Sequence, residues 1–115
     1  MIKKNLVSIL IINYNNEKYL DRAIKSCINQ SYKNLEILIY DDKSTDGSRF
    51  LLNKYSKHKK IKYFINKSKK KNMPAIDAKN SYYKLISKSK GDIIFLLDSD
   101  DYFLKNKVYK IVKKF

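Results

Sequence analysis

Six of the eleven carboxylates in this sequence fall into two short clusters, each directly after an apolar run. The clusters contain Asp41, Asp42 and Asp46, and then Asp98, Asp100 and Asp101. Like charges placed together are unfavourable unless a cation or several hydrogen-bond donors lie between them. The two clusters therefore indicate either a site for a positively charged ligand or a tightly hydrogen-bonded turn.

The second cluster contains an Asp-x-Asp step, formed by Asp98 and Asp100 around Ser99. In an extended segment, residues i and i+2 point to the same side. Mg²⁺ and Mn²⁺ usually combine one or two carboxylates with ligand phosphates and water. The step predicts half of a cation site that a diphosphate would complete. An Asp pair after a strand is also common in turns and helix caps, and that interpretation fits Asp46 before Gly47.

The apolar runs before these clusters predict strands, because they are short and rich in branched residues. Strands are expected over residues 6–12, 35–40, 61–65 and 92–97, and helices after residue 16, over 48–56, over 74–89 and around 108–115. Strands that alternate with helices imply right-handed βαβ units and a parallel sheet, so the fold class is α/β. The carboxyl ends of such strands share one edge, where Tyr14 and Asn15 should join both acidic clusters.

Apolar periodicity predicts which helix faces are buried. The first helix should bury a stripe that runs from Tyr19 to Ile28, with Asn15 or Asn16 as its cap. The second helix should turn Phe50 towards the core, and the last should bury a stripe that ends at Phe115. Cys27 lies on the first stripe and is expected to be a buried, unreactive thiol.

The length of 115 residues and a hydrophobic content of 43% indicate one folded domain. No apolar run approaches the roughly 20 residues of a membrane span, so we expect none. The net charge of +15 raises nucleic acid or an anionic surface as partners. However, 24 of the 26 basic residues are lysines, whereas phosphate clamping and base recognition favour arginine. Nucleic acid is therefore not the expected partner, and a basic binding module is kept as the alternative function.

Four segments of the chain, taken in order, resemble the family 2 glycosyltransferases of the GT-A fold. They are residues 7–20, residues 26–37, the turn Asp41-Asp42-Lys43-Ser44-Thr45-Asp46-Gly47-Ser48, and the stretch from Gly91 to Asp101 that ends in Leu97-Asp98-Ser99-Asp100-Asp101. The resemblance implies a Rossmann-like, mostly parallel sheet flanked by helices and truncated after the Asp-x-Asp motif. It also implies a single nucleotide-sugar-binding domain over residues 1–115, without the acceptor-binding half.

The family resemblance implies a role for each matching residue. The nucleotide would be bound by Tyr14, Asn15, Asp41, Asp42 and Asp98, and an Mn²⁺ or Mg²⁺ ion by Asp100 and Asp101. The donor would be a nucleotide sugar, with a UDP-sugar favoured, and the acceptor a glycan or a lipid-linked sugar in polysaccharide biosynthesis. Such an enzyme would work in the cytoplasm or at the inner face of the membrane. Homo-oligomers are compatible with this picture.

Three departures from the family pattern affect these expectations. Ile12 and Asn13 replace the usual Pro-Thr. Lys79 stands in the segment Ala78-Lys79-Asn80, which resembles the family's Ala-Arg-Asn but lies farther from Gly91 than usual. The sequence has no carboxylate after Asp101, so the general base of an inverting transfer is absent and the catalytic residue is unknown. We expect the chain to bind nucleotide and to transfer sugar poorly. Phosphatase and receiver-domain motifs do not fit, and two glycines cannot build a Gly-rich phosphate loop.

Overall fold

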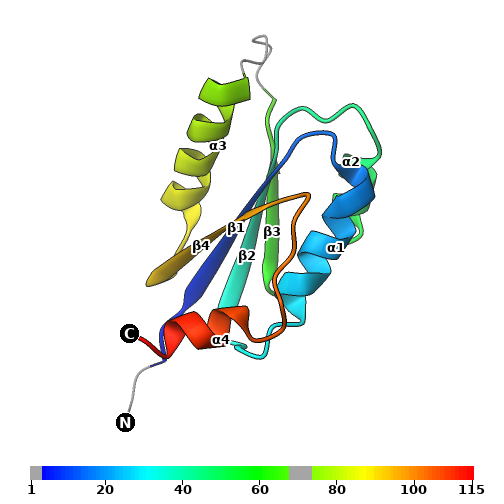
Figure 1. The fold of residues 1–115 in the computed structure, drawn as a ribbon. Helices are drawn as coiled ribbons and strands as arrows, with labels where there is room; N and C mark the ends of the chain where they lie inside the picture. The colour runs from blue at the N-terminus through cyan, green and yellow to red at the C-terminus, as the bar shows by residue number, and fades with distance from the viewer. Residues whose placement is uncertain (1–3, 68–73) are drawn as a thin grey trace.

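The protein folds into a four-stranded parallel sheet with helices on both faces (Figure 1). This computed structural model describes residues 4–67 and 74–115, and for residues 74–78 only the backbone. The strands are β1 (Val7–Asn13), β2 (Leu35–Asp41), β3 (Ile61–Ile65) and β4 (Ile93–Asp98). Their order across the sheet is β3-β2-β1-β4, so β1 is central and lies between β2 and β4.

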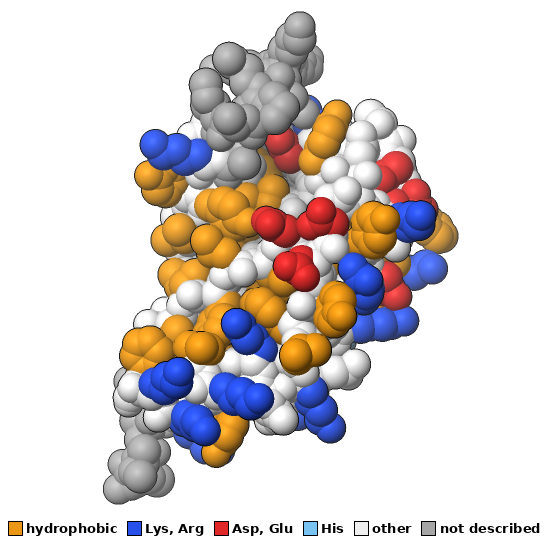
Figure 2. All heavy atoms as spheres, viewed as in Figure 1, with side chains coloured by type: hydrophobic (Ala, Val, Ile, Leu, Met, Phe, Trp, Pro, Cys, Tyr) orange, Lys and Arg blue, Asp and Glu red, His pale blue; other side chains and the backbone are white. Residues whose placement is uncertain are grey.

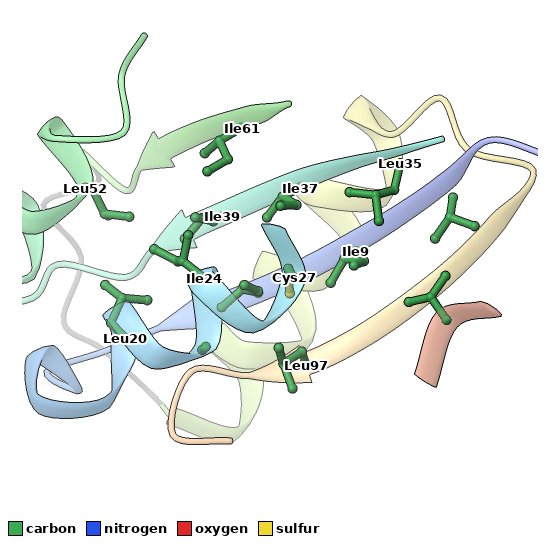
Figure 3. Close-up of a cluster of buried hydrophobic side chains, with 14 residues drawn as sticks. Ile9, Leu20, Ile24, Cys27, Leu35, Ile37, Ile39, Leu52, Ile61 and Leu97 are labelled. Atoms are coloured by element: carbon green, nitrogen blue, oxygen red, sulfur yellow. The ribbon is translucent and has the colours of Figure 1, made fainter. Parts of the chain in front are cut away.

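The helices divide between the two faces of the sheet. They are α1 (Glu17–Ile28), α2 (Ser48–Asn53), α3 (Pro74–Lys88) and α4 (Lys107–Val112). Buried residues of α1, α2 and α4 form one core with the sheet, and Figure 3 shows Leu20 and Ile24 of α1 facing Ile9 and Ile39. On the opposite face, Leu85 of α3 packs with alternate residues of β1 and β2. This two-sided cover explains why β1 and β2 are nearly continuous apolar runs.

The predicted elements are present, with ends that shift by a few residues. The third strand has the predicted bounds, and the second helix ends at Asn53, three residues early. Three predicted core positions are wrong: Tyr19 is 39%, Phe50 72% and Phe115 77% exposed. Tyr19 and Phe50 lie on exposed positions of α1 and α2, and Phe115 lies beyond the end of α4 at Val112. Within α2, Leu52 takes the core position instead.

The fold also bears on the expectations for Cys27 and for membrane-spanning segments. Cys27 is fully buried in α1, and burial raises the pKa of its thiol to about 12, which confirms the prediction of an unreactive cysteine. Within the described residues, none of the helices has the length and apolar character needed to span a bilayer.

Candidate functional site

Strand register brings both acidic clusters to the same edge of the sheet. At the end of β1, Asn13 pairs with Asp41 of β2 on one side, and Ile12 pairs with Asp98 of β4 on the other. Neighbouring strands lie about 4.8 Å apart, so the two aspartate positions are separated by about 10 Å across β1. Figure 2 shows acidic side chains gathered at the end of β4, with hydrophobic side chains around them. The predicted common edge is confirmed.

Asp41 is fully buried and its carboxylate is held by the turn that follows it. Oδ1 accepts hydrogen bonds from Nδ2 of Asn13 at 2.9 Å and from Oγ of Ser44 at 2.6 Å. Oδ2 accepts the N–H of Ser44 at 3.0 Å, and Nε of Arg49 lies 3.8 Å away. Asp41 therefore holds the turn together. A direct contact between Asp41 and a nucleotide stays a prediction, and that contact would require these hydrogen bonds to break.

Asp42 lies beside Asp41 and is bonded to a residue that the sequence did not point to. Its backbone N–H donates to the carbonyl of Asn13 at 2.9 Å, and its Oδ1 accepts Nδ2 of Asn66 at 2.8 Å. Asn66 follows β3 directly, and its own N–H donates to the carbonyl of Asp41. The turn after β2 is therefore tied to both neighbouring strands, and Asp42, 7% exposed, is fixed near the surface of the edge.

Tyr14 and Asn15, the two predicted site residues after β1, lie in different surroundings. Asn15 has a φ of 52°, in the left-handed region that Asn tolerates better than most residues. Its Oδ1 accepts the N–H of Thr45 at 2.7 Å and of Asp46 at 3.3 Å, so its side chain joins the two turns. Tyr14 is 50% exposed at the same edge. The geometry gives Asn15 a structural function and leaves the ring of Tyr14 accessible to a ligand.

Asp46 caps two helices at once, as its position before Gly47 predicts. Its Oδ2 accepts the N–H of Glu17 at 3.0 Å and its Oδ1 accepts the N–H of Ser48 at 2.9 Å. Burial alone would raise the pKa of Asp46, but the hydrogen bonds from Ser48 and Glu17 outweigh it and lower that pKa. Asn16 is the N-cap residue of α1, as predicted, but its side chain makes no cap hydrogen bond. Its amide instead binds Ser99, as described next.

The second cluster forms an exposed turn with a buried anchor. The N–H of Asp101 donates to the carbonyl of Asp98 at 3.0 Å, which closes the turn. Between them Ser99 is 1% exposed, and its Oγ accepts Nδ2 of Asn16 at 2.9 Å. The carboxylates of Asp98, Asp100 and Asp101 are exposed, and none forms an ion pair within the part of the chain that the structure describes.

Tyr82 of α3 reaches the same turn from the other face of the sheet. Its hydroxyl donates to Oδ1 of Asp98 at 3.4 Å. Burial, and then the negative charge of Asp98, raise the pKa of Tyr82 to about 12. The hydroxyl therefore stays protonated at neutral pH and acts as a hydrogen-bond donor to Asp98.

These residues fit a divalent cation that shares its coordination with a ligand. No group of three or more acidic, histidine or cysteine side chains among the described residues could enclose a metal ion. A complete protein cage is not needed, since Mg²⁺ and Mn²⁺ sites often contain one or two carboxylates plus phosphate oxygens. Asp100 suits this role because its exposed carboxylate has no hydrogen-bond or ion-pair partner among residues 4–67 and 79–115.

Sequence reasoning missed a row of polar residues on α1 that holds the chain after the acidic turn. The row consists of Arg22, Ser26 and Gln30, which are spaced four residues apart along the helix and its end. Arg22 bonds the carbonyl of Asp100, Ser26 accepts the N–H of Phe103, and Gln30 bonds the backbone of Leu104 and Val108. One signal was available: Arg22 is one of only two arginines in a chain with 24 lysines.

Lys79, in the segment Ala78-Lys79-Asn80, lies on the surface of the protein. It is exposed on α3, and its Nζ lies 5.9 Å from the centroid of the Tyr83 ring. The structure thus gives Lys79 a surface contact within its own helix.

Comparison with known sequences adds independent information. The sequence model for the family described as glycosyl transferase family 2 matches residues 8–115. An uncharacterized glycosyltransferase of Haemophilus influenzae is 40% identical over 106 residues, which cover 91% of this chain and 40% of that protein. The UDP-Glc:alpha-D-GlcNAc-diphosphoundecaprenol beta-1,3-glucosyltransferase WfaP of Escherichia coli is 38% identical over 103 residues, which cover 90% of this chain and 38% of that protein.

Solved structures with the same arrangement include two enzymes with bound nucleotide sugars. TarS of S. aureus in complex with UDP-GlcNAc has a TM-score of 0.79 at 22% identity, covering 93% of this chain and 30% of that one. The mannosyltransferase PcManGT of Pyrobaculum calidifontis, in complex with GDP-Man and Mn²⁺, has a TM-score of 0.72 at 15% identity, covering 88% and 29%. At these identities the likeness establishes a shared fold.

Proposed function

This chain belongs to glycosyl transferase family 2, and from that premise we propose that its sheet edge binds the diphosphate of a nucleotide sugar together with a divalent cation. Its parallel sheet flanked by helices is the GT-A fold, as the sequence predicts. One observation carries the proposal. The register places Asp42 and the exposed turn from Asp98 to Asp101 at one edge, on either side of β1.

Each residue of the edge has a role in this proposal. The exposed ring of Tyr14 flanks the base, and Asp42 accepts a hydrogen bond from it. Asp98, held by the hydroxyl of Tyr82, meets the ribose or the sugar. Asp100, with Asp101 beside it, binds the cation through carboxylate oxygen, the ligand type that Mn²⁺ and Mg²⁺ prefer. Asp41 and Asn15 keep the two turns in place.

The chemistry assigned to the edge is donor binding and support of the leaving group. A cation bound there would offset the charge on the departing nucleotide diphosphate. The acidic turn orients the diphosphate, and buried Ser99 fixes the turn. We place this in an inverting transfer, which needs a carboxylate base to take the proton of the acceptor. Residues 102–115 contain no such carboxylate, so that segment does not supply the base.

The donor and acceptor classes are proposed by analogy with relatives. A UDP-sugar is favoured because WfaP is named as using UDP-Glc and TarS was solved with UDP-GlcNAc. A lipid-linked acceptor is favoured because WfaP, and a Campylobacter jejuni relative that is 30% identical over 109 residues, are both named for acceptors linked to undecaprenol. The chain spans 38–40% of the length of the first two relatives, so full transfer activity remains part of the proposal.

Thermal unfolding with a panel of nucleotides tests this function. UDP, GDP and dTDP are each added with and without Mn²⁺. A ligand at about 100 times its Kd adds roughly 2.7 kcal/mol to the free energy of unfolding, which raises the midpoint by several degrees. We expect UDP to stabilise the protein only when Mn²⁺ is present. Absence of stabilisation by any of the three with Mn²⁺ would overturn the proposal.

The dependence of binding on Mn²⁺ and on salt distinguishes the proposed function from the alternative of a basic binding module. Binding of a polyanion to lysines weakens steeply with added salt and does not depend on Mn²⁺. No contact among the residues that the structure describes favours that alternative, and the family match does not support it.

A further inference from the structure

The exposed side chain of Arg22 lies over two tyrosine rings on the surface of α1. Its Cζ lies 5.5 Å from the centroid of the Tyr19 ring and 4.6 Å from that of the Tyr102 ring. Tyr19 is one turn earlier on the same helix, whereas Tyr102 directly follows the acidic turn. Arginine stacked on aromatic faces loses much of its rotamer freedom, so this side chain is pre-organised.

The same guanidinium also bonds the acidic turn itself. Nη2 of Arg22 donates to the backbone carbonyl of Asp100 at 3.0 Å. The hydrogen bond goes to the backbone, so the carboxylate of Asp100 stays available to a ligand. Arg22 thus holds the chain at two successive points, the carbonyl of Asp100 and the ring of Tyr102.

Other residues of α1 and its flanks hold the two ends of this segment, and Arg22 joins its middle to α1. Before it, Asn16 holds Ser99 at 2.9 Å, and after it Ser26 accepts the N–H of Phe103 at 3.1 Å. Between Ser99 and Phe103, Arg22 supplies the hydrogen bond and ring contact that join the segment to α1 in the described part of the chain. Within the segment, the N–H of Asp101 bonds the carbonyl of Asp98 at 3.0 Å, and Oδ1 of Asp101 accepts the N–H of Tyr102 at 2.8 Å. The direction of the carboxylates of Asp100 and Asp101 therefore depends on these local bonds together with the contacts that Arg22 makes to Asp100 and Tyr102.

We propose that Arg22 is a positioning residue, which directs the carboxylates of Asp100 and Asp101 towards the cation. This inference rests on the proposed function of the edge. It makes a prediction that charge alone would not make, because a positive side chain near the turn repels a cation through space. If Arg22 acted only through its charge, removing it would strengthen cation binding. If it positions the turn, removing it weakens cation binding.

Arginine and lysine differ in the features that matter here. The planar guanidinium can stack between two rings and still donate a directed hydrogen bond, whereas an ammonium is a point charge on a flexible stem. Replacement by lysine keeps the repulsive charge and loses the stacked geometry. R22K should therefore bind the cation more weakly than R22A, and both more weakly than the unaltered chain. Charge alone does not predict this full order, since it would make R22A bind more tightly than the unaltered chain.

The experiment is an Mn²⁺ titration at a fixed, saturating concentration of UDP, with free Mn²⁺ followed by electron paramagnetic resonance. The proteins compared are the unaltered chain, R22A, R22K and the control K18A. Lys18 is a suitable control because its Nζ also lies over the Tyr19 ring, at 5.7 Å, yet it makes no contact with the acidic turn. We expect about fivefold weaker binding in R22A, weaker binding still in R22K, and a change below about twofold in K18A.

Two further measurements keep the outcome unambiguous. The thermal midpoint of each variant shows whether it is folded, and Y102L removes one ring while it keeps the charge of Arg22. Y102L should also weaken Mn²⁺ binding. The inference is overturned if R22A binds Mn²⁺ as tightly as the unaltered chain or more tightly, or if R22K equals it. Failure of the unaltered chain to bind Mn²⁺ with UDP would instead overturn the proposed function, and the inference with it.

Discussion

The amide of Asn13 donates a 2.9 Å hydrogen bond to the buried carboxylate of Asp41, between two residues that pair at the carboxyl ends of β1 and β2. Asn13 stands where the family usually has threonine, and it is fully buried. Its amide also contacts Oγ of Ser44 at 3.2 Å, so one side chain joins the strand end to the turn. These two bonds fix Asp41 and the turn that follows it, next to the exposed second cluster.

Replacement of Asp41 by alanine should therefore destabilise the whole domain. It leaves the buried N–H and hydroxyl donors of Ser44 without an acceptor and reduces the amide of Asn13 to its 3.2 Å contact with Ser44, at a cost of about 3 kcal/mol in the free energy of unfolding. Urea unfolding followed by circular dichroism measures this difference. Asp92→Ala is the matched control, since Asp92 is exposed at the opposite end of β4 and accepts one hydrogen bond, from the N–H of Leu6. Equal midpoints for the two variants would contradict the structural role of Asp41.

The two glycines should respond differently to replacement by alanine. A Cβ at Gly91 would lie 2.4 Å from Oγ and 2.6 Å from the backbone nitrogen of Ser8, and the backbone cannot move away cheaply. A Cβ at Gly47 would meet the carboxylate of Glu17, the end of a flexible side chain. We expect Gly91→Ala to cost about 2 kcal/mol and Gly47→Ala less than about 1 kcal/mol. Urea midpoints of the two variants test this order, and the reverse order would contradict it.

Ionisation of Tyr82 should destabilise the fold at alkaline pH. Burial and the charge of Asp98 raise its pKa from 10 to about 12, so the folded protein holds this proton more tightly than the unfolded chain. The stabilisation is complete below pH 10 and is lost as the pH rises from 10 towards 12. Unfolding free energies of the unaltered chain and Tyr82→Phe should converge over that range. In the Asp98→Asn variant, ¹³C NMR of labelled tyrosine should show a lower pKa for Tyr82. An unchanged pKa there would contradict the contact.

Apolar patterning was sufficient to predict the sheet and the edge where the aspartates meet. Branched runs define β1 and β2, and parallel topology then places Asp41 and Asp98 at one edge, which the register confirms. Periodicity failed at Phe50, because a six-residue helix covers too little of the sheet to bury a second apolar position at its rim.

Side-chain partners across the chain could not be predicted in the same way. The bond from Asn66 to Asp42 joins positions 24 residues apart, and the bond from Arg22 to Asp100 joins positions 78 apart. No local pattern encodes such pairs, since they follow from the packing of finished elements. The family resemblance assigned both Asp41 and Asp42 to nucleotide binding. Both side chains are buried, and their partners distinguish them: Asp41 binds Asn13 and Ser44 within the turn, whereas Asp42 binds Asn66.

The most direct test of a common binding site at this edge is to locate the Mn²⁺ ion that is bound when UDP is present. Its unpaired electrons broaden amide signals of nearby residues in a ¹⁵N NMR spectrum, and Asp100→Asn and Asp92→Asn provide a pair with the same charge change at opposite ends of the strand. We predict broadening of both the turn from Asp98 to Asp101 and the amides of Tyr14 and Asp42, lost in Asp100→Asn and kept in Asp92→Asn. Broadening that leaves this edge unaffected, or persists in Asp100→Asn, would contradict the account.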